Sequence, residues 1–321
     1  MGLECVSKSI NHEKERIKIQ LGIYNQKDNG RVMSKIAHEV SDMKQIIRRH
    51  ELTGAEWERV QPYFPERQLG DKGRPRREPR QMLNGIFWIA RTGAAWRDLP
   101  ERYGPYSTVY KRFKEWSDSG LIEKIFHELG EDADLQDISI DSSYIKAHKA
   151  SAGAERGGFK SDDTVGTSSQ DQKVSVDKTQ VNQCIGVSRG GRSTKIHAAV
   201  DALGNPIAIM LTTGNTADIT VADKLITQID FKGSTILADR AYTKCEFREF
   251  ITNHGADYCI PPTSNISDPW DVDWWLYKER HLVETFFLKL KEFRRVAMRY
   301  DKLASRFLSF VHLACIRILL A

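Results

Sequence analysis

After Asp137 the sequence alternates between short apolar runs and segments with helical periodicity, and no other feature restricts the fold as strongly. The strand-like runs cover residues 137–141, 194–201, 206–212, 235–239 and 257–260. The helix-period segments cover about 219–229, 243–253 and 276–294. Short strands bounded by turn residues and interleaved with helices predict a mixed sheet that packs against helices.

The region before residue 133 predicts helices only. Thr53 and Glu56 have the spacing of a capping box ahead of a short helix. The other predicted helices run from Pro79 to Thr92 before Gly93, from Thr108 to Asp118 after a Ser107 cap, and from Leu121 to Leu129. The predicted fold class is α+β, with a helical, helix-turn-helix-like domain at residues 49–132 and a mixed-sheet domain at residues 133–321.

Three carboxylates occupy positions from which their side chains can converge. Asp141 ends one strand-like run, Asp239 ends another, and Glu284 lies on a helix-period segment. Mg²⁺ prefers oxygen ligands and is usually held by a few carboxylates together with substrate phosphate oxygens. Two such ions about 3.5 to 4 Å apart stabilise both oxygens of an in-line displacement at phosphorus. The pattern therefore predicts divalent-metal chemistry on a phosphodiester.

The neighbours of Glu284 sharpen this prediction. At about 100° per residue around an α-helix, Tyr277, Arg280, Glu284 and Lys291 share one stripe roughly 60° wide. An adjacent stripe is apolar and is predicted to pack on the sheet: Val283, Phe286, Phe287, Leu290 and Phe293. The helix is thus expected to bury one face and to present a carboxylate, two cations and a phenol along its edge.

The spacing Tyr-x2-Arg-x3-Glu-x6-Lys at Tyr277, Arg280, Glu284 and Lys291 resembles the signature of bacterial insertion-sequence DDE transposases, specifically the insertion-sequence-5 group. Three other segments resemble that group: residues 141–148, 190–197 and 291–302. The resemblance runs from about Leu52 to the C-terminus.

The resemblance implies a ribonuclease-H-like catalytic domain with Asp141, Asp239 and Glu284 as catalytic metal ligands. It implies two Mg²⁺ ions, replaceable by Mn²⁺, with Asp141 on both ions and each of the other two carboxylates on one. It also implies DNA partners: the terminal inverted repeats of the element, which are cut to free a 3′-hydroxyl, and a target DNA that this hydroxyl attacks. Two ends must be held together, so a homodimer is expected, with no nucleotide cofactor.

Two positions depart from the pattern of the group. Arg240-Ala241-Tyr242 follows the second aspartate where the group often has glycine in the middle, so Ala241 could restrict a tight turn. Thr285 follows the glutamate where arginine is common, which removes one phosphate contact. Neither change alters a carboxylate, so the predicted reaction class stands and the activity of this copy is open.

DNA contacts are predicted from clustered cations. Lys111, Arg112 and Lys114 lie on the third predicted helix. The loop before the second helix is also basic: Lys72, Arg74, Arg76, Arg77 and Arg80. A helix in a major groove with the loop on phosphates is one interpretation, and a solvated basic face is the other. Arg280 and Lys291 suit phosphate contacts, and Tyr277 suits stacking or packing beside them; salt bridges and helix packing are the alternative for all three.

The segment around Gly191 allows two interpretations. Gly186, Gly191 and Arg192 are a near miss to a phosphate-binding loop, but the required lysine is replaced and a strand follows where a helix is needed. Nucleotide binding is therefore not predicted. Arg189, Arg192 and Lys195 are interpreted as facing DNA, or as solvated turn residues.

The formal net charge of +5 and the pI of about 8.8 suit a nucleic-acid partner. The five cysteines are scattered without a Cys-x-x-Cys pair, which argues against a disulfide framework or a zinc knuckle. The sequence has neither a run of 18 apolar residues nor a signal peptide. A cytoplasmic protein near the chromosome, with no membrane association, is expected.

Two segments predict little regular structure. Residues 1–48 are rich in Lys, Glu, Asn and Gln and are expected to form a poorly ordered extension, with Met33 or Met43 as a natural start; an additional DNA-binding arm is the alternative. Residues at about 150–185 are rich in Gly, Ser, Asp, Lys and Gln and predict a mobile loop.

Two other functions remain open at this point. A non-catalytic DNA-binding repressor derived from a transposase would bind the element ends without metal-dependent nicking. A ribonuclease-H-like nuclease would hydrolyse DNA without joining it. A glycosidase with paired carboxylates is a distant third, because the basic stripe beside Glu284 suits phosphate better than sugar.

Overall fold

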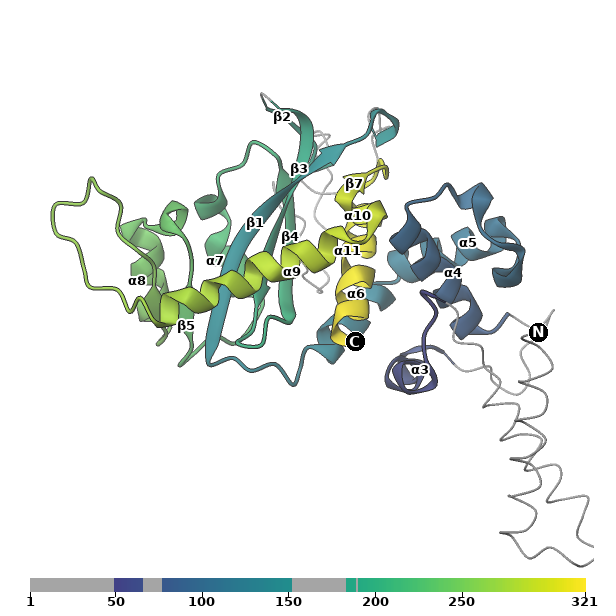
Figure 1. The fold of residues 1–321 in the computed structure, drawn as a ribbon, viewed down its shortest axis with the longest axis horizontal. Coiled ribbons are helices and arrows are strands. Elements are labelled where there is room, and N and C mark those ends of the chain that lie inside the picture. Colours follow the sequence, from purple (N-terminus) through teal and green to yellow (C-terminus); the bar gives the residue numbers. More distant parts are fainter. Residues whose placement is uncertain (1–48, 66–76, 152–182, 189) are drawn as a thin grey trace, which may run out of the picture. The chain divides into compact units, whose positions relative to one another are not determined.

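β1 (Asp137–Ala147) is the central strand of a mixed sheet, and its two sides differ in strand direction (Figure 1). On one side β1 pairs antiparallel with β3 (Gly191–Val200), which pairs antiparallel with β4 (Pro206–Thr213) and β2 (Gly186–Ser188). On the other side β5 (Thr235–Leu237) and β6 (Asp257–Cys259) continue the sheet in parallel. A short strand, β7 (Met298–Arg299), pairs parallel with the last residues of β1.

The computed structural model describes residues 49–65, 77–151, 183–188 and 190–321. The predicted extension at 1–48 and most of the predicted loop at 150–185 lie outside the described residues, as do Lys72, Arg74, Arg76 and Arg189. None of the helices in the described ranges combines the length and the apolar character that a bilayer crossing needs.

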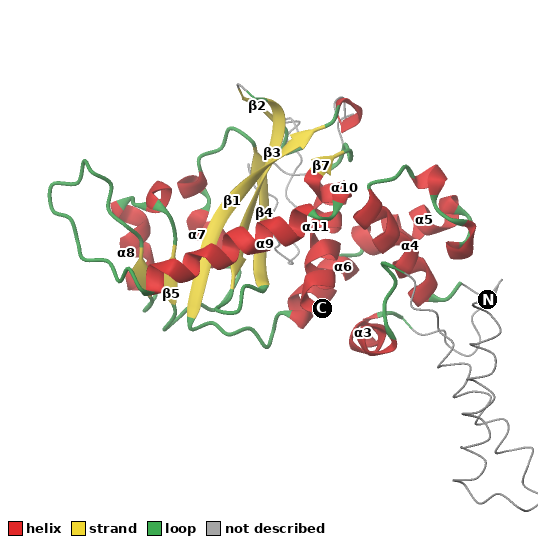
Figure 2. Ribbon diagram, in the orientation of Figure 1, coloured by secondary structure: helices red, strands yellow, loops and turns green. Residues whose placement is uncertain are grey.

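Helices cover both faces of the sheet, and this explains why its central strands lack a polar face (Figure 2). β3 is buried from Ser193 to Val200, and β4 is buried from Pro206 to Thr212. On one face the sheet packs against α9 (His281–Lys291) and α11 (Ala304–Leu319). On the other face it packs against α7 (Ala222–Ile226), which shares a core cluster with α8 (Cys245–Asn253).

The element order of this region confirms the predicted mixed sheet. Three antiparallel strands are followed by α7, β5, α8, β6 and α9, in the order that the apolar runs and helix-period segments indicate. One predicted helix, residues 276–294, is divided into a 3-10 helix at Leu276–Arg280, α9, and α10 (Arg294–Ala297). The division has local causes: the Asp273 carboxylate accepts from the N–H groups of Trp275 and Leu276, and Phe293 has an extended backbone.

The N-terminal region contains four α-helices in the described residues: α3 (Gly54–Val60), α4 (Pro79–Thr92), α5 (Tyr106–Asp118) and α6 (Leu121–Leu129). The capping box is confirmed, because Thr53 and Glu56 each accept the backbone N–H of the other. Gly93 ends α4 with φ at 69°, a conformation that favours glycine. The predicted Ser107 cap is wrong: α5 begins at Tyr106, two residues before the predicted start, and the carbonyl of Pro105 accepts from Val109 N–H at 3.2 Å.

α11 was not predicted, and it joins the helical region to the sheet. Every residue from Arg306 to Ile316 is buried, so this helix shows little of the polar face that marks a surface helix. It packs against α4, α5 and α6 and also against α9 and β4. One hydrophobic cluster therefore continues from the helical region to one face of the sheet, and residues 49–321 form one compact unit. The boundary between domains near residue 132 stays a prediction.

Candidate active site

Asp141 lies in the middle of β1 and faces the side of the sheet that α9 covers. Its side chain lies on the same face of the strand as Ile145, which belongs to the core cluster containing Val283 of α9. The backbone N–H of Ser142 donates to Oδ1 of Asp141 at 2.7 Å, and the guanidinium of Arg280 donates to Oδ2 at 3.3 Å. The carboxylate is thus held from one side by its own strand and from the other by the segment that leads into α9.

The surroundings of Asp141 oppose its ionisation. Burial raises the pKa of Asp141 above its ordinary value, and the negative charges of Asp239 and Asp218 raise it further. The N–H of Ser142 and the positive charge of Arg280 act in the opposite direction without cancelling the rise. A positive charge bound nearby would lower the pKa of Asp141 and stabilise its ionised form.

Asp239 comes close to Asp141 through the parallel pairing of β5 with β1. Ser139 lies opposite Leu237 in this pairing, and Asp141 and Asp239 each follow two residues later, so the register brings the two carboxylates side by side. Asp239 caps a 3-10 helix at Arg240–Tyr242, and its Oδ1 accepts from the N–H of Ala241 at 2.8 Å. Ala241 is not among the described residues with positive φ, so alanine fits this turn without the strain anticipated from the loss of glycine.

Glu284 lies in the first turn of α9, one helical turn after Arg280. The guanidinium of Arg280 donates to Oε1 of Glu284, the i,i+4 pair expected from the motif. Tyr277 lies on the preceding 3-10 helix, where residues three apart face the same side. Its ring centroid is 5.8 Å from the Arg280 guanidinium, so the predicted phenol and cation remain neighbours although they are not on one α-helix.

Arg280 therefore bridges two of the three predicted carboxylates. Its side chain, with 18% exposed, donates to Asp141 on the sheet and to Glu284 on the helix. Burial lowers the pKa of Arg280, but its hydrogen bond with Glu284 and the nearby negative charges outweigh burial and raise it overall. Asp239 does not share this cation; its Oδ1 is turned to the Ala241 N–H.

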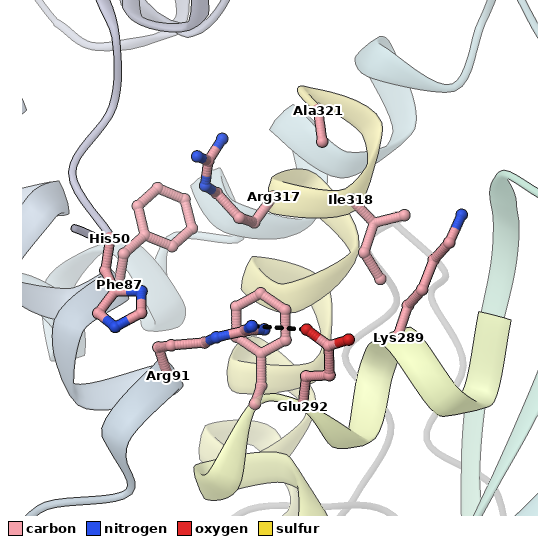
Figure 3. Close-up of a pocket in the computed structure, with 9 residues that line it drawn as sticks. His50, Phe87, Arg91, Lys289, Glu292, Arg317, Ile318 and Ala321 are labelled. Atoms are coloured by element: carbon pink, nitrogen blue, oxygen red, sulfur yellow. Dashed lines mark hydrogen bonds and ion pairs between the residues drawn. The ribbon is translucent and has the colours of Figure 1, made fainter. Parts of the chain in front are cut away.

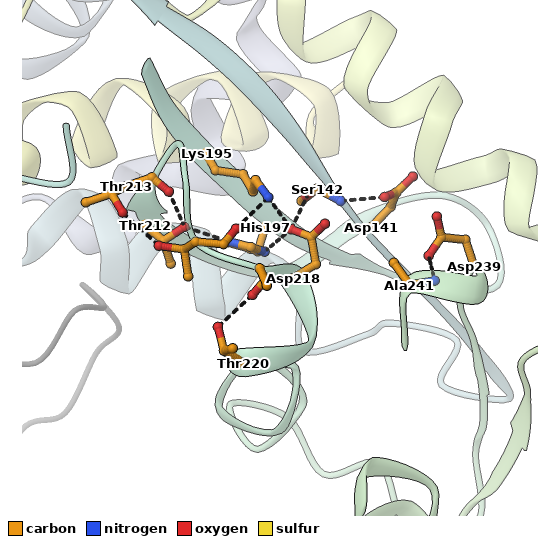
Figure 4. Close-up of polar contacts among 12 residues, drawn as sticks. Asp141, Ser142, Lys195, His197, Thr212, Thr213, Asp218, Thr220, Asp239 and Ala241 are labelled. Carbon is orange, nitrogen blue, oxygen red and sulfur yellow. Dashed lines mark hydrogen bonds and ion pairs between the residues drawn. The ribbon is translucent and has the colours of Figure 1, made fainter. Parts of the chain in front are cut away.

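Behind Asp141, on the other face of β1, a buried polar cluster is built on Asp218 (Figure 4). Oδ1 of Asp218 accepts from the Ser142 hydroxyl at 2.7 Å and from Nζ of Lys195 at 2.8 Å. Nδ1 of His197 lies 3.6 Å from the same oxygen, and its Nε2 shares a 2.8 Å hydrogen bond with the Thr212 hydroxyl. Ser142 thus contacts both carboxylates, Asp141 through its N–H and Asp218 through its hydroxyl.

This cluster corrects one interpretation and adds residues that sequence reasoning missed. Lys195 is 2% exposed and donates to Asp218 and to the Thr216 carbonyl, so it does not face DNA. Burial lowers the pKa of His197 to about 4, which keeps the imidazole neutral. Lys195 and His197 lie in the segment 190–197, which resembles the insertion-sequence-5 group. No local signal in the sequence connects them with Asp218, which follows β4.

The other predicted DNA-contacting cations are mostly exposed. Lys111 and Lys114 are exposed on α5, whereas Arg112 is partly buried and donates to Glu115 at 2.6 Å. Lys291 is exposed at the end of α9, and Arg192 is exposed near the start of β3. Arg80, interpreted as a loop residue, lies in the first turn of α4 and donates to the Leu52 carbonyl at 2.9 Å, which gives it a structural contact.

A separate cleft of about 300 Å³ lies between α4 and the segments α9 and α11 (Figure 3). It is lined by His50, Phe87, Arg91, Lys289, Glu292, Phe293, Arg317, Ile318 and Ala321. Arg91 donates to Glu292 at 2.5 Å, and Arg317 donates to Glu56. None of the three predicted carboxylates lines this cleft. The contacts between predicted site residues lie instead around Asp141, Arg280 and Glu284.

Family models match most of the described chain. Residues 52–126 match a family described as a putative transposase of the IS4/5 family, and residues 132–269 and 236–321 match two families described as transposase DDE domain. A putative transposase for insertion sequence element IS6501 from Brucella ovis is 43% identical over 126 residues, which are 38% of this chain and 95% of the relative. The chain belongs to the bacterial insertion-sequence DDE transposases.

Two further relatives have names that state no activity. The uncharacterised protein y4sN of Sinorhizobium fredii is 40% identical over 101 residues, 32% of this chain and 80% of the relative. An uncharacterised protein of insertion element IS402 from Burkholderia cepacia is 31% identical over 103 residues, 28% of this chain and 69% of the relative. The matches confirm the resemblance drawn from Tyr277, Arg280, Glu284 and Lys291.

Among solved structures, a Mos1 transposase paired-end complex with left transposon end aligns with a TM-score of 0.24 at 13% identity, covering 77% of this chain and 82% of that one. A pre-cleavage Mos1 transpososome aligns with a TM-score of 0.25 at 12% identity, covering 93% of this chain and 98% of that one. TM-scores this low carry no weight for the fold. The sheet topology and the family matches stand without them.

Proposed function

We propose that this transposase binds the terminal inverted repeats of its own insertion sequence, cuts phosphodiester bonds at the element ends with divalent metal ions, and transfers the freed 3′-hydroxyls to target DNA. The observation that supports the reaction is the contact of Arg280 with Asp141 and Glu284. A sheet residue and a helix residue share one cation there, and Asp239 ends the neighbouring parallel strand.

The proposed catalytic domain is ribonuclease-H-like. Its support is the arrangement around β1, with antiparallel β3 and β4 on one side and parallel β5 and β6 on the other. This arrangement puts Asp141 on the central strand and Asp239 at the end of the adjacent strand. α9 then covers the sheet with Glu284 in its first turn.

The three carboxylates suit Mg²⁺ in chemistry and in place, and Mn²⁺ is expected to substitute. Oxygen donors are the ligands that these cations prefer, and Arg280 shows that Asp141 and Glu284 already accept a shared positive group. Within the described ranges, however, no three His, Cys, Asp or Glu side chains are gathered closely enough to hold a metal ion. Binding therefore requires Asp239 to turn from the Ala241 N–H and Arg280 to release at least one carboxylate.

The proposed roles are those that the family resemblance implies. Asp141 would hold both ions, and Asp239 and Glu284 would each hold one. When bound, such ions stabilise the attacking and leaving oxygens of an in-line displacement. Arg280, once released, has its guanidinium at the site and can donate to a phosphate oxygen of the DNA. Tyr277 supports Arg280 through its ring, and Lys291 is an exposed cation for the DNA backbone.

The proposed partners are double-stranded DNA and a second copy of the chain. Two element ends must be held together for joining, so a homodimer is the expected active complex. Lys111, Arg112, Lys114 and Arg192 are the proposed further contacts to DNA. We propose no nucleotide cofactor, because strand transfer conserves the energy of the phosphodiester bond.

The test uses purified full-length protein, labelled DNA that carries the element's own ends, a target plasmid, and Mg²⁺ or Mn²⁺. We expect nicks at the ends and joined products that need the metal and that disappear with Glu284→Gln. Nicking without joining would favour a hydrolytic nuclease. End binding without nicking by the wild-type protein would favour a repressor.

A further inference from the structure

Tyr242 is the least explained polar residue near the candidate site. It follows Asp239 in the 3-10 helix Arg240–Tyr242, and it is 1% exposed. Its ring packs in the core cluster on the α7 and α8 side of the sheet, with its centroid 6.2 Å from that of Phe247. Its hydroxyl is buried and has no hydrogen-bond partner among the described residues. Buried hydroxyls are nearly always hydrogen-bonded, so an exception needs a cause.

The hydroxyl lies among the acidic residues of the site. Burial raises the pKa of Tyr242 well above its ordinary value, and the negative charges of Asp218, Asp141 and Asp239 raise it further. The 3-10 helix that contains Asp218 packs against the one that contains Tyr242. The phenol therefore keeps its proton and is a hydrogen-bond donor that faces carboxylates from three segments.

The carboxylates whose charges act on Tyr242 already have other donors. Oδ1 of Asp218 accepts from Ser142 and Lys195, and Oδ1 of Asp239 accepts from the N–H of Ala241. Asp141 uses both of its oxygens, one for the Ser142 N–H and one for Arg280. The hydroxyl of Tyr242 thus lies within the field of an acidic site whose own hydrogen bonds leave it out.

We propose that Tyr242 is a further residue of the active site, whose hydroxyl donates a hydrogen bond to an oxygen atom held by the acidic cluster. Two sources have this chemistry: a water in the hydration shell of a divalent cation, and a non-bridging phosphate oxygen of DNA. The ring, fixed in the core, holds the donor in place before either arrives. The inference rests on the proposed function, because it needs the carboxylates to bind a cation or DNA.

The test compares Tyr242→Phe with the wild-type full-length protein. The variant keeps the ring and removes only the hydroxyl, so without metal it should unfold at the same temperature as the wild type or higher. Titrated with Mn²⁺ alone, its apparent affinity should fall about threefold to tenfold, the factor of one neutral hydrogen bond. The readouts are the calorimetric binding constant and the rise in unfolding temperature with Mn²⁺.

Tyr103→Phe is the matched control. Tyr103 is 2% exposed, but its hydroxyl donates to Glu51 at 2.9 Å and accepts from Arg102 at 3.1 Å, far from the triad in sequence. This variant should unfold at a lower temperature without metal and should bind Mn²⁺ as the wild type does. Both substitutions remove one phenolic oxygen atom. Opposite effects on the unfolding temperature and on Mn²⁺ affinity would therefore come from the place of each hydroxyl in the fold.

A second titration separates the two sources of the oxygen. With a short DNA duplex in the presence of a chelator, weaker binding by Tyr242→Phe would assign the acceptor to a phosphate, whereas weaker Mn²⁺ binding alone would assign it to the cation's water. The inference is overturned if Tyr242→Phe lowers the metal-free unfolding temperature, which reveals a partner within the protein, or if neither titration changes. Failure of the wild-type protein to bind Mn²⁺ would instead overturn the proposed function as well.

Discussion

Among the described residues, two clusters of charged side chains differ in how completely their hydrogen bonds are made. At the junction of α10, β7 and α11, Arg299 is fully buried and donates to three backbone carbonyls and to the Thr194 hydroxyl. Arg295 makes two hydrogen bonds to Asp301. Around Asp141 in the middle of β1, one arginine is shared by two carboxylates, and the Tyr242 hydroxyl has no partner in the described residues.

The difference separates charges that hold the fold from charges kept available for a ligand. A buried charge with all of its hydrogen bonds made stabilises one structure, and its removal leaves several unpaired groups. A carboxylate with a raised pKa, such as Asp141, lowers the stability of the folded state at neutral pH. Binding of a cation would offset this loss of folded-state stability. Substitutions in the two clusters should therefore have opposite effects on stability and activity.

The largest effect is expected at the carboxylates. Asp141→Asn should abolish metal-dependent cutting, by more than about 100-fold, because even residues that only support metal ligands cost 10- to 100-fold. Without metal, its free energy of unfolding should stay within about 1 kcal/mol of the wild type, since a partly buried pair with Arg280 is lost while burial of a charge is relieved. A nicking assay and denaturant unfolding on the same preparations measure both quantities.

Asp239→Asn and Glu284→Gln should behave in the same way, with DNA binding retained. A variant that cuts at a near-normal rate would remove its carboxylate from the proposed triad. A variant that loses cutting together with several kcal/mol of stability would place that residue with the structural cluster instead.

Next in size is the effect of Arg299 on stability. Arg299→Met should lower the free energy of unfolding by about 3 to 5 kcal/mol, because it leaves the acceptors of a buried charge without a donor. Arg299→Lys should recover only part of the loss, since an ammonium cannot reproduce the planar fork. Urea unfolding measures the change. A loss below about 1 kcal/mol in Arg299→Met would show that the surrounding groups find other partners and would weaken the comparison.

The comparison also shows which parts of the structure can be predicted from sequence. Local signals were sufficient for the capping box at Thr53, for the strands β1 to β6 apart from β2, and for the place of Arg280 one turn before Glu284, because spacing along the chain determines each of these. The apolar runs also marked Asp141 and Asp239 as residues of strand-like segments, although only the folded sheet makes those segments neighbours. These features depend on periodicity, which a single sequence displays directly.

Features that depend on distant segments were not predictable in this way. α11 is buried from Arg306 to Ile316 by contacts with α4, α5, α6, α9 and β4, and these contacts come from segments far away in the sequence. The cluster of Lys195, His197 and Asp218 joins residues from β3 and a later turn, and only the folded sheet brings them together. Lys195 was interpreted as facing DNA or as a solvated turn residue; its burial follows from the covering of both faces of β3.

A smaller effect is expected from acid on the helical side of the molecule. His312 of α11 is buried and stacks on Phe126, with ring centroids 5.0 Å apart. Burial, assisted by the charge of His127, lowers the pKa of His312 to about 3 from 6.5. The unfolded chain therefore binds a proton at higher pH than the folded chain does, and stability should fall as the pH drops from 6.5 towards 3.

Unfolding free energies of the wild type and of His312→Phe, measured across this range, test the assignment. The variant keeps an aromatic ring on Phe126, and its stability should depend less steeply on pH. Equal slopes for the two proteins would assign the acid sensitivity to other groups, His197 among them, because its buried imidazole has the same sign of shift.

The smallest effect separates exposed cations from paired ones on α5. Lys111 is exposed and, like Lys114, has no ion pair in the described residues, whereas Arg112 donates to Glu115. If α5 contacts DNA phosphates, Lys111→Ala should reduce the slope of log affinity against log salt by about 1, the effect of one phosphate contact. Arg112→Ala should reduce it less, since Glu115 already offsets its charge. Equal reductions would mean that DNA separates Arg112 from Glu115, and no reduction in either variant would leave α5 a solvated basic face.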